Sequence, residues 1–136
     1  IMQLIEVIYH ETTGVDVIDA VKGFGRRLGK QPIVVRNTPG FATSRLGVAL
    51  GMEAIRMLEQ GVATAEDIDK AMELGYRHPM GPLKLTDLVG LDVRMAIGEY
   101  LAKELKNPAF EPPELMRRMV EQGKLGKKTK EGFYRW

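Results

Sequence analysis

Residues 41–60 have the sequence FATSRLGVALGMEAIRMLEQ, in which apolar side chains recur at the three- and four-residue spacing of an α-helix. The apolar stripe consists of Leu46, Leu50, Ala54, Met57 and Leu58. Glu53 and Arg56 occupy another face. The pattern predicts a long amphipathic helix over 41–60, which Gly61 ends as a C-cap glycine.

Further helices are predicted on the C-terminal side of this one. Thr64 and Asp67 form a capping-box pattern at the start of a helix that reaches about Leu74, and Pro82 suits the first turn of the next helix. Asp92 is expected to cap another helix. The apolar stripe of that helix is Val93, Ala96, Ile97, Tyr100, Leu101 and Leu105. A last helix is expected over 112–120, so the chain should be mainly helical.

The first forty residues have a different pattern. Residues 2–9 and 31–36 are rich in β-branched and large apolar side chains, which favours two short strands. A helix is predicted between them, over 15–28. Because an isolated pair of strands is marginal in water, the segment 1–9 is expected to need a further partner, from a missing upstream domain or from another chain.

Composition excludes several classes of function. The chain has 136 residues, 44% of them hydrophobic, which suits one folded domain. Twenty Lys and Arg against 18 Asp and Glu give a formal charge of +2, so nucleic acid and anionic membranes are not expected as partners. The absence of Cys excludes disulfides, thiolate catalysis and cysteine-bound zinc. His10 and His78 lack the clustered acids of a metal site, and without a visible signal peptide a cytoplasmic location is expected.

Four segments resemble motifs of the NAD-dependent 3-hydroxyacyl-CoA dehydrogenases, in particular the 3-hydroxybutyryl-CoA type. They are residues 2–8, 38–45, 78–92 and 126–134. The corresponding family motifs are M-K-L-V-E-V, T-P-G-F-x-x-N-R, Y-P-M-G-P-x-x-L-x-D-x-V-G-L-D and G-K-K-T-G-E-G-F-Y. Each motif alone is weak, but their order and spacing agree, so the resemblance covers essentially the whole chain.

The resemblance implies a fold and an assembly. The fold is that of the helical C-terminal, dimerisation domain, of the 6-phosphogluconate dehydrogenase C-terminal-like type, with one or two short strands at its start. We expect one such domain over 1–136, without the N-terminal Rossmann domain, because the chain contains no G-x-G-x-x-G after a strand. The family's catalytic His, in H-F-F-N-P, is also absent. A homodimer is expected, with an exchange of strand 1–9 between chains as one possibility.

The resemblance also implies site residues. Glu6 matches the carboxylate that pairs with the catalytic His, although an acid on an edge strand can also simply face solvent. Ser44 stands where the family commonly has Asn, which contacts the substrate carbonyl region; otherwise Ser44 is a first-turn helix residue. Lys128 matches a Lys that contacts NAD, with a solvated basic tail as the alternative. No metal ligand is expected.

The function implied is reversible oxidation of 3-hydroxyacyl-CoA to 3-ketoacyl-CoA with NAD, in fatty acid β-oxidation or short-chain acyl-CoA metabolism. The chain would supply one wall of the acyl-CoA cleft and the dimer contact, and alone it should be inactive, because NAD binds mainly to the missing domain. A stand-alone, non-catalytic helical oligomerisation module is the main alternative. A nucleic-acid-binding helical domain that uses the basic tail is a second alternative, which the charge balance disfavours.

Overall fold

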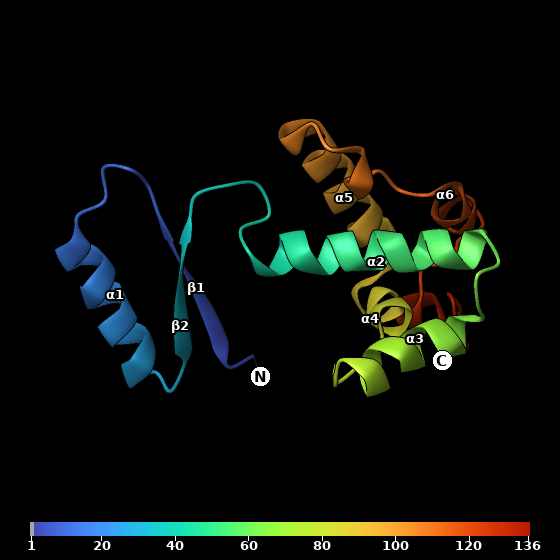
Figure 1. Cartoon of the computed structure of the whole chain (residues 1–136), viewed down its shortest axis with the longest axis horizontal. Coiled ribbons are helices and arrows are strands. Elements are labelled where there is room, and N and C mark those ends of the chain that lie inside the picture. The colour runs from blue at the N-terminus through green and yellow to red at the C-terminus, as the bar shows by residue number, and fades with distance from the viewer. Residues whose placement is uncertain (1) are drawn as a thin grey trace. The chain divides into compact units, whose positions relative to one another are not determined.

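The computed structural model describes residues 2–136, which group into two compact units that divide after Arg45. Figure 1 shows a strand–helix–strand unit at the N-terminus and a helical unit that continues to the C-terminus. Within residues 2–136, the six α-helices and the two-stranded sheet confirm the predicted mainly helical class. No helix within residues 2–136 is long and apolar enough to cross a bilayer.

The first unit is a β–α–β arrangement. Strand β1 (Leu4–Tyr9) pairs in parallel with strand β2 (Gln31–Arg36), and helix α1 (Val15–Arg27) connects them. Gly25 lets α1 approach the sheet, since a Cβ there would lie 3.2 Å from Cγ2 of Ile5. The sequence predicts one domain over 1–136. In the structure, β1, α1 and β2 belong to the first of the two compact units. Residue 1 of the predicted segment 1–9 lies outside the described residues.

Helix α1 leaves its apolar stripe in contact with solvent. Phe24 is 52% exposed and Val17 is 51% exposed, and Val21 and Leu28 are exposed as well. Gly25 is the buried residue of this helix. The apolar side chains therefore recur at helical spacing, but no other part of residues 2–136 buries them.

The second unit is built from five helices around one apolar core. Helix α2 (Thr43–Glu59) is followed by α3 (Ala65–Gly75), α4 (Pro82–Val89), α5 (Leu91–Leu105) and α6 (Glu114–Glu121). Short 3-10 helices cover Pro108–Phe110 and Lys127–Thr129. The fully buried apolar members of the core are Met52, Ile55, Leu83, Leu91, Leu101 and Met116.

Helix α5 buries a different face from the predicted one. Its inward residues are Leu91, Arg94, Gly98 and Leu101. Of the predicted stripe Leu101 is buried, and Ile97 and Leu105 pack partly buried against the core. Val93 is 43% exposed and Tyr100 is 54% exposed. A Cβ at Gly98 would overlap Met52 and the carbonyl oxygen of Phe110, so these groups occupy the place of a side chain on this face. A hydrophobicity pattern cannot show that a glycine and an arginine face the core.

The buried face of helix α2 also differs slightly from the predicted apolar stripe. Val48, Met52 and Ile55 are buried, while Leu46 of the predicted stripe is 72% exposed. At the helix termini one cap is confirmed and one is wrong. The hydroxyl of Thr64 accepts the N–H of Asp67 at 3.2 Å, as the capping-box pattern predicts. The N-cap of α5 is Gly90, not Asp92, and the Asp92 carboxylate binds a side chain instead.

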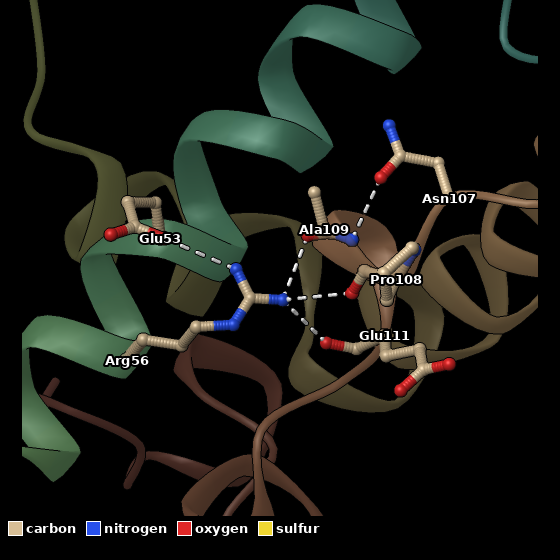
Figure 2. A network of polar contacts seen from close by, with 6 residues as sticks. All are labelled: Glu53, Arg56, Asn107, Pro108, Ala109 and Glu111. Carbon is tan, nitrogen blue, oxygen red and sulfur yellow. Dashed lines mark hydrogen bonds and ion pairs between the residues drawn. The ribbon is translucent and has the colours of Figure 1, made fainter.

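One arginine fastens the connection between α5 and α6. Nη2 of Arg56, on α2, donates to the carbonyl oxygens of Ala109 at 2.8 Å and Glu111 at 2.9 Å, with Pro108 farther away at 3.4 Å (Figure 2). Nη1 of Arg56 pairs with Glu53 at 3.2 Å. Because a guanidinium presents several N–H groups in a fixed fork, it can serve these carbonyls together.

Candidate active site

Glu6 lies on β1 and caps the N-terminus of helix α2. Its Oε1 accepts the backbone N–H groups of Ala42 at 3.0 Å and Thr43 at 3.1 Å, and its Oε2 accepts the Thr43 hydroxyl at 2.9 Å. A carboxylate at this position satisfies N–H groups that have no partner within the helix and interacts favourably with the helix dipole. Glu6 is therefore a half-buried side chain, and both of its carboxylate oxygens accept hydrogen bonds.

The charge state of Glu6 follows from these contacts. Partial burial by itself would raise the pKa of the carboxyl group, but the hydrogen bonds from Thr43 and Ala42 outweigh that effect and hold the pKa below its ordinary value. The side chain is consequently anionic at neutral pH. An anionic carboxylate suits a role beside an imidazolium, which it would stabilise.

A tight turn places the N–H groups that Glu6 accepts. Gly40 has φ 75° and Phe41 has φ 47°, so two successive residues adopt the left-handed conformation. The N–H of Phe41 donates to the carbonyl of Thr38 at 3.0 Å, which closes the turn. Left-handed backbone is unusual for a bulky residue such as Phe. The turn reverses the chain after β2 and directs the first amides of α2 at Glu6.

Ser44 lies in the first turn of α2, directly after Thr43, and is exposed. The structure thus brings two of the predicted site residues, Glu6 and Ser44, to the same helix N-terminus. Ser44 also fits its alternative description as a first-turn residue near a cap. Its hydroxyl is a donor next to the helix dipole, a position that suits a partly negative oxygen.

Lys128 lies in the second unit, in the 3-10 turn Lys127–Thr129. Its ammonium binds both carboxylate oxygens of Asp92, at 2.5 Å and 2.7 Å. The hydrogen bond from Lys128 is the largest cause that lowers the pKa of Asp92. This role of Asp92 was not predicted from the sequence, in which Asp92 is expected to cap α5. The only signal available was the G-L-D motif itself.

The C-terminal tail is tied to the fold through buried Asp87. This carboxylate accepts the N–H groups of Phe133 and Tyr134, each at 2.9 Å, and the indole N–H of Trp136 at 3.0 Å. Gly126 and Gly132 pack so closely on Asp87 that a Cβ at either would overlap it. The motif 126–134 therefore folds directly onto the motif 78–92.

A second buried carboxylate, Asp69, supports the same arrangement. It accepts the N–H groups of Leu83 at 2.8 Å and Lys84 at 2.9 Å, which caps α4, and the Tyr134 hydroxyl at 2.7 Å. Burial and the hydrogen bond to Asp69 raise the pKa of Tyr134. The burial of the Asp69 and Asp87 carboxylates is thus explained by the hydrogen bonds that they accept within the fold. Within residues 2–136 no group of His, Asp and Glu forms a metal site.

Comparison with known proteins agrees with the fold. The model of the family described as "3-hydroxyacyl-CoA dehydrogenase, C-terminal domain" matches residues 40–136. The model described as "3-hydroxyacyl-CoA dehydrogenase, NAD binding domain" matches residues 1–38. A match over most of the chain defines the class as a dehydrogenase-type helical domain, preceded here by a segment of the nucleotide-binding type. The chain belongs to the 3-hydroxyacyl-CoA dehydrogenase family.

Relatives with this match are longer than the chain. The mitochondrial hydroxyacyl-coenzyme A dehydrogenase of Sus scrofa is 42% identical over 137 residues, which cover 100% of this chain and 44% of the relative. The probable 3-hydroxybutyryl-CoA dehydrogenase of Deinococcus radiodurans is 42% identical over 100% of this chain and 49% of the relative. The crystal structure of (S)-3-hydroxybutyryl-CoA dehydrogenase from Ralstonia eutropha superimposes with a TM-score of 0.92 at 42% identity, covering 100% of this chain and 48% of that chain. The chain therefore spans about half the length of these relatives.

Proposed function

We propose that this chain is the substrate-cleft and dimerisation part of an enzyme that interconverts 3-hydroxyacyl-CoA and 3-ketoacyl-CoA with NAD. Residues 2–38 would be the last segment of the NAD-binding domain, and residues 40–136 the helical domain. The observation that carries the proposal is the carboxylate of Glu6, held by three hydrogen bonds beside Ser44 at the start of α2. The family membership supports NAD as the cofactor.

Glu6 would orient the general base of the reaction. A His supplied by the preceding part of the NAD-binding domain would remove the proton of the substrate hydroxyl, as an imidazole can near neutral pH. Glu6 would fix the tautomer of that His and stabilise the imidazolium that forms. The hydrogen bonds from Ala42 and Thr43 keep the Glu6 carboxylate ionised and prevent it from rotating away.

Ser44 would contribute to the stabilisation of charge on the substrate oxygen. Its hydroxyl can donate one hydrogen bond from the first turn of α2, and the positive end of the helix dipole adds to the effect. Ser is shorter than the Asn common in the family, so its hydrogen bond is expected to be weaker or to pass through a water molecule.

Lys128 would contact NAD, which when bound supplies the acceptor for the hydride. The side chain fits such a contact, since it is 44% exposed and two of its three N–H groups suffice for the two oxygens of Asp92. Lys124 and Lys127 have other neighbours: Lys124 pairs with Glu131 at 3.0 Å, and Lys127 lies over the Trp136 ring.

We further propose a homodimer located in the cytoplasm. Val93 and Tyr100 are exposed on the same helix, and Leu46 is 72% exposed on α2, so apolar surface is available for a second copy. Exchange of β1 between chains is disfavoured, because it would first require β1 to separate from β2, with which it pairs over six residues of the same chain. The mass of the complex by light scattering and cell fractionation would test these two points.

One experiment tests the proposed activity. The chain alone and the chain preceded by a complete NAD-binding domain are each mixed with NADH and acetoacetyl-CoA, and NADH absorbance is followed. We expect turnover by the two-domain protein and none by the chain alone. A matched Glu6→Gln variant of the two-domain protein should lose most of that turnover. Steady oxidation of NADH by the chain alone would contradict the proposal.

Failure of the two-domain protein across short and long 3-ketoacyl-CoA substrates would favour the alternative. In that case the chain would be a helical oligomerisation module without catalytic function. The two outcomes are distinguishable because dimerisation should persist in the second case while turnover does not.

A further inference from the structure

The ion pair between Lys128 and Asp92 joins two parts of the chain that lie 36 residues apart. The ammonium approaches both carboxylate oxygens, at 2.5 Å and 2.7 Å, so the contact is bidentate on the side of the acid. Asp92 lies in the first turn of α5 and Lys128 in the turn of the C-terminal tail. An exposed ion pair is informative mainly when its geometry is good. Here both carboxylate oxygens approach the ammonium nitrogen.

Gly90 makes room for the lysine side chain. This residue has φ 103°, a conformation that favours glycine, and it begins α5. A Cβ at this position would lie 3.1 Å from Nζ and 3.3 Å from Cε of Lys128. The lysine stem therefore crosses the backbone of Gly90 before its ammonium reaches Asp92. Gly90 and Asp92 together form the contact site of the Lys128 side chain.

The backbone of the tail is held by other contacts. Asp87 binds the N–H groups of Phe133 and Tyr134, and the N–H of Gly126 donates to the carbonyl of Glu131 at 2.8 Å. The turn that carries Lys128 is thus in place without the ion pair. What Asp92 adds is the position and the charge environment of the ammonium group alone.

We propose that Asp92 is a positioning residue for the cofactor contact of Lys128, an inference that rests on the proposed function. Both oxygens of Asp92 lie within hydrogen-bond distance of the ammonium nitrogen, and the pair has no net charge. An N–H of the ammonium that does not face Asp92 is then suited to an uncharged acceptor, and a hydroxyl of an NAD ribose is the group of that chemistry. A phosphate would instead favour a lysine whose charge is not already compensated.

A double-mutant cycle in the two-domain protein tests this inference. The variants are Asp92→Asn, Lys128→Met and the double variant, and the measured quantity is the Kd for NADH from a fluorescence titration. We expect each single substitution to raise the Kd by about three- to tenfold, the effect of one hydrogen bond. The double variant should be no weaker than Lys128→Met, because Asp92 acts only through Lys128.

Matched controls separate positioning from a general loss of charge or of structure. Glu66→Gln also removes one exposed carboxylate that faces a lysine, at 4.0 Å from Lys70, and should leave the Kd unchanged. The Kd of Asp92→Asn should depend more steeply on salt than that of the parent, since its ammonium is no longer compensated. Asp92→Glu keeps the charge and should bind NADH more tightly than Asp92→Asn, which a purely structural defect would not produce.

Three results would overturn the inference. An unchanged or lower Kd in Asp92→Asn, alongside a raised Kd in Lys128→Met, would show that Lys128 acts as an independent charge. Additive effects in the double variant would show that Asp92 does not act through Lys128. An unchanged Kd in Lys128→Met would remove the proposed cofactor contact itself, and with it the role of Asp92, while turnover by the two-domain protein would leave the proposed reaction standing.

Discussion

The carboxylate of Asp87 accepts the indole N–H of Trp136 at 3.0 Å, so this indole is bound to a fully buried acid of helix α4. The same carboxylate accepts the backbone N–H groups of Phe133 and Tyr134. Three donors converge on two oxygens that no solvent reaches. Such a group stabilises the fold only while all of its partners remain in place.

Replacement of Asp87 should therefore destabilise the protein strongly. In Asp87→Asn the new amide would direct N–H groups at the N–H groups of the tail, which leaves buried donors unsatisfied. We expect the free energy of unfolding to fall by about 2–4 kcal/mol, measured by urea denaturation. Glu121→Gln, on the exposed end of α6, should change it by less than about 0.5 kcal/mol. Equal effects of the two substitutions would contradict this account of the tail.

Substitutions of Arg94 and Gly51 should have opposite effects on the free energy of unfolding, and the two effects should depend on each other. Arg94 is buried, its Nη1 donates to the carbonyl of Gly47 at 2.5 Å, and its Nε has no partner within the described residues. Desolvation lowers the pKa of this guanidinium. Replacement of such a charge by Met is expected to be neutral or stabilising. A Cβ at Gly51 would lie 2.5 Å from Nη1 of Arg94, so Gly51→Ala should cost about 1–3 kcal/mol.

The double variant Gly51→Ala/Arg94→Met provides the check on that pair. Removal of the guanidinium frees the space that the new methyl group needs, so most of the stability lost in Gly51→Ala should return. Simple addition of the two single effects in urea denaturation would show that the two residues do not compete for space.

Glu6 should make stability depend on pH. Its pKa is lower in the folded protein than in an unfolded chain. Its stabilising contribution is therefore complete above the unfolded pKa and is lost as the pH falls through the folded pKa. We expect Glu6→Gln to lower Tm at neutral pH, and the difference from the parent to shrink on acidification. A difference that stays constant down to acidic pH would contradict the role of Glu6 as an ionised cap.

Ser44 should affect turnover rather than cofactor binding. If its hydroxyl donates to the substrate oxygen in the two-domain protein, Ser44→Ala should lower kcat by about tenfold and leave the Kd for NADH unchanged. Ser44→Asn restores the residue common in the family and should equal or exceed the parent. Thr12→Ala, which removes another exposed hydroxyl, serves as the control. Parent-like kinetics of Ser44→Ala would remove the residue from the mechanism.

Local sequence rules predicted most of the helices and both strands. Thr64 capped its helix as expected, and the long helix after Phe41 appeared with its termini displaced by one or two residues. These features depend on periodicity and on capping, which act over a few residues. The burial of α5 was not predictable in this way. It depends on Gly98, whose importance comes from side chains that lie on other elements.

Motifs in the sequence located the candidate site residues, but the contacts of these residues could not be predicted from it. Glu6 and Ser44 were located through motifs, but the capping contacts between β1 and α2 arise from residues 36 and 37 positions apart. Asp87 binds N–H groups of residues 46 and 47 positions away, and a backbone donor leaves no trace in the sequence. Asp92 is ambiguous by nature, since an acid after a glycine suits both a helix cap and an ion pair.

The way Asp87 holds Trp136 has a practical consequence for anyone who handles this protein. Residues 133–136 supply three donors to a fully buried carboxylate, so a variant that lacks them would leave Asp87 in the interior without these partners. A label attached to the indole nitrogen of Trp136 would remove one of these three donors.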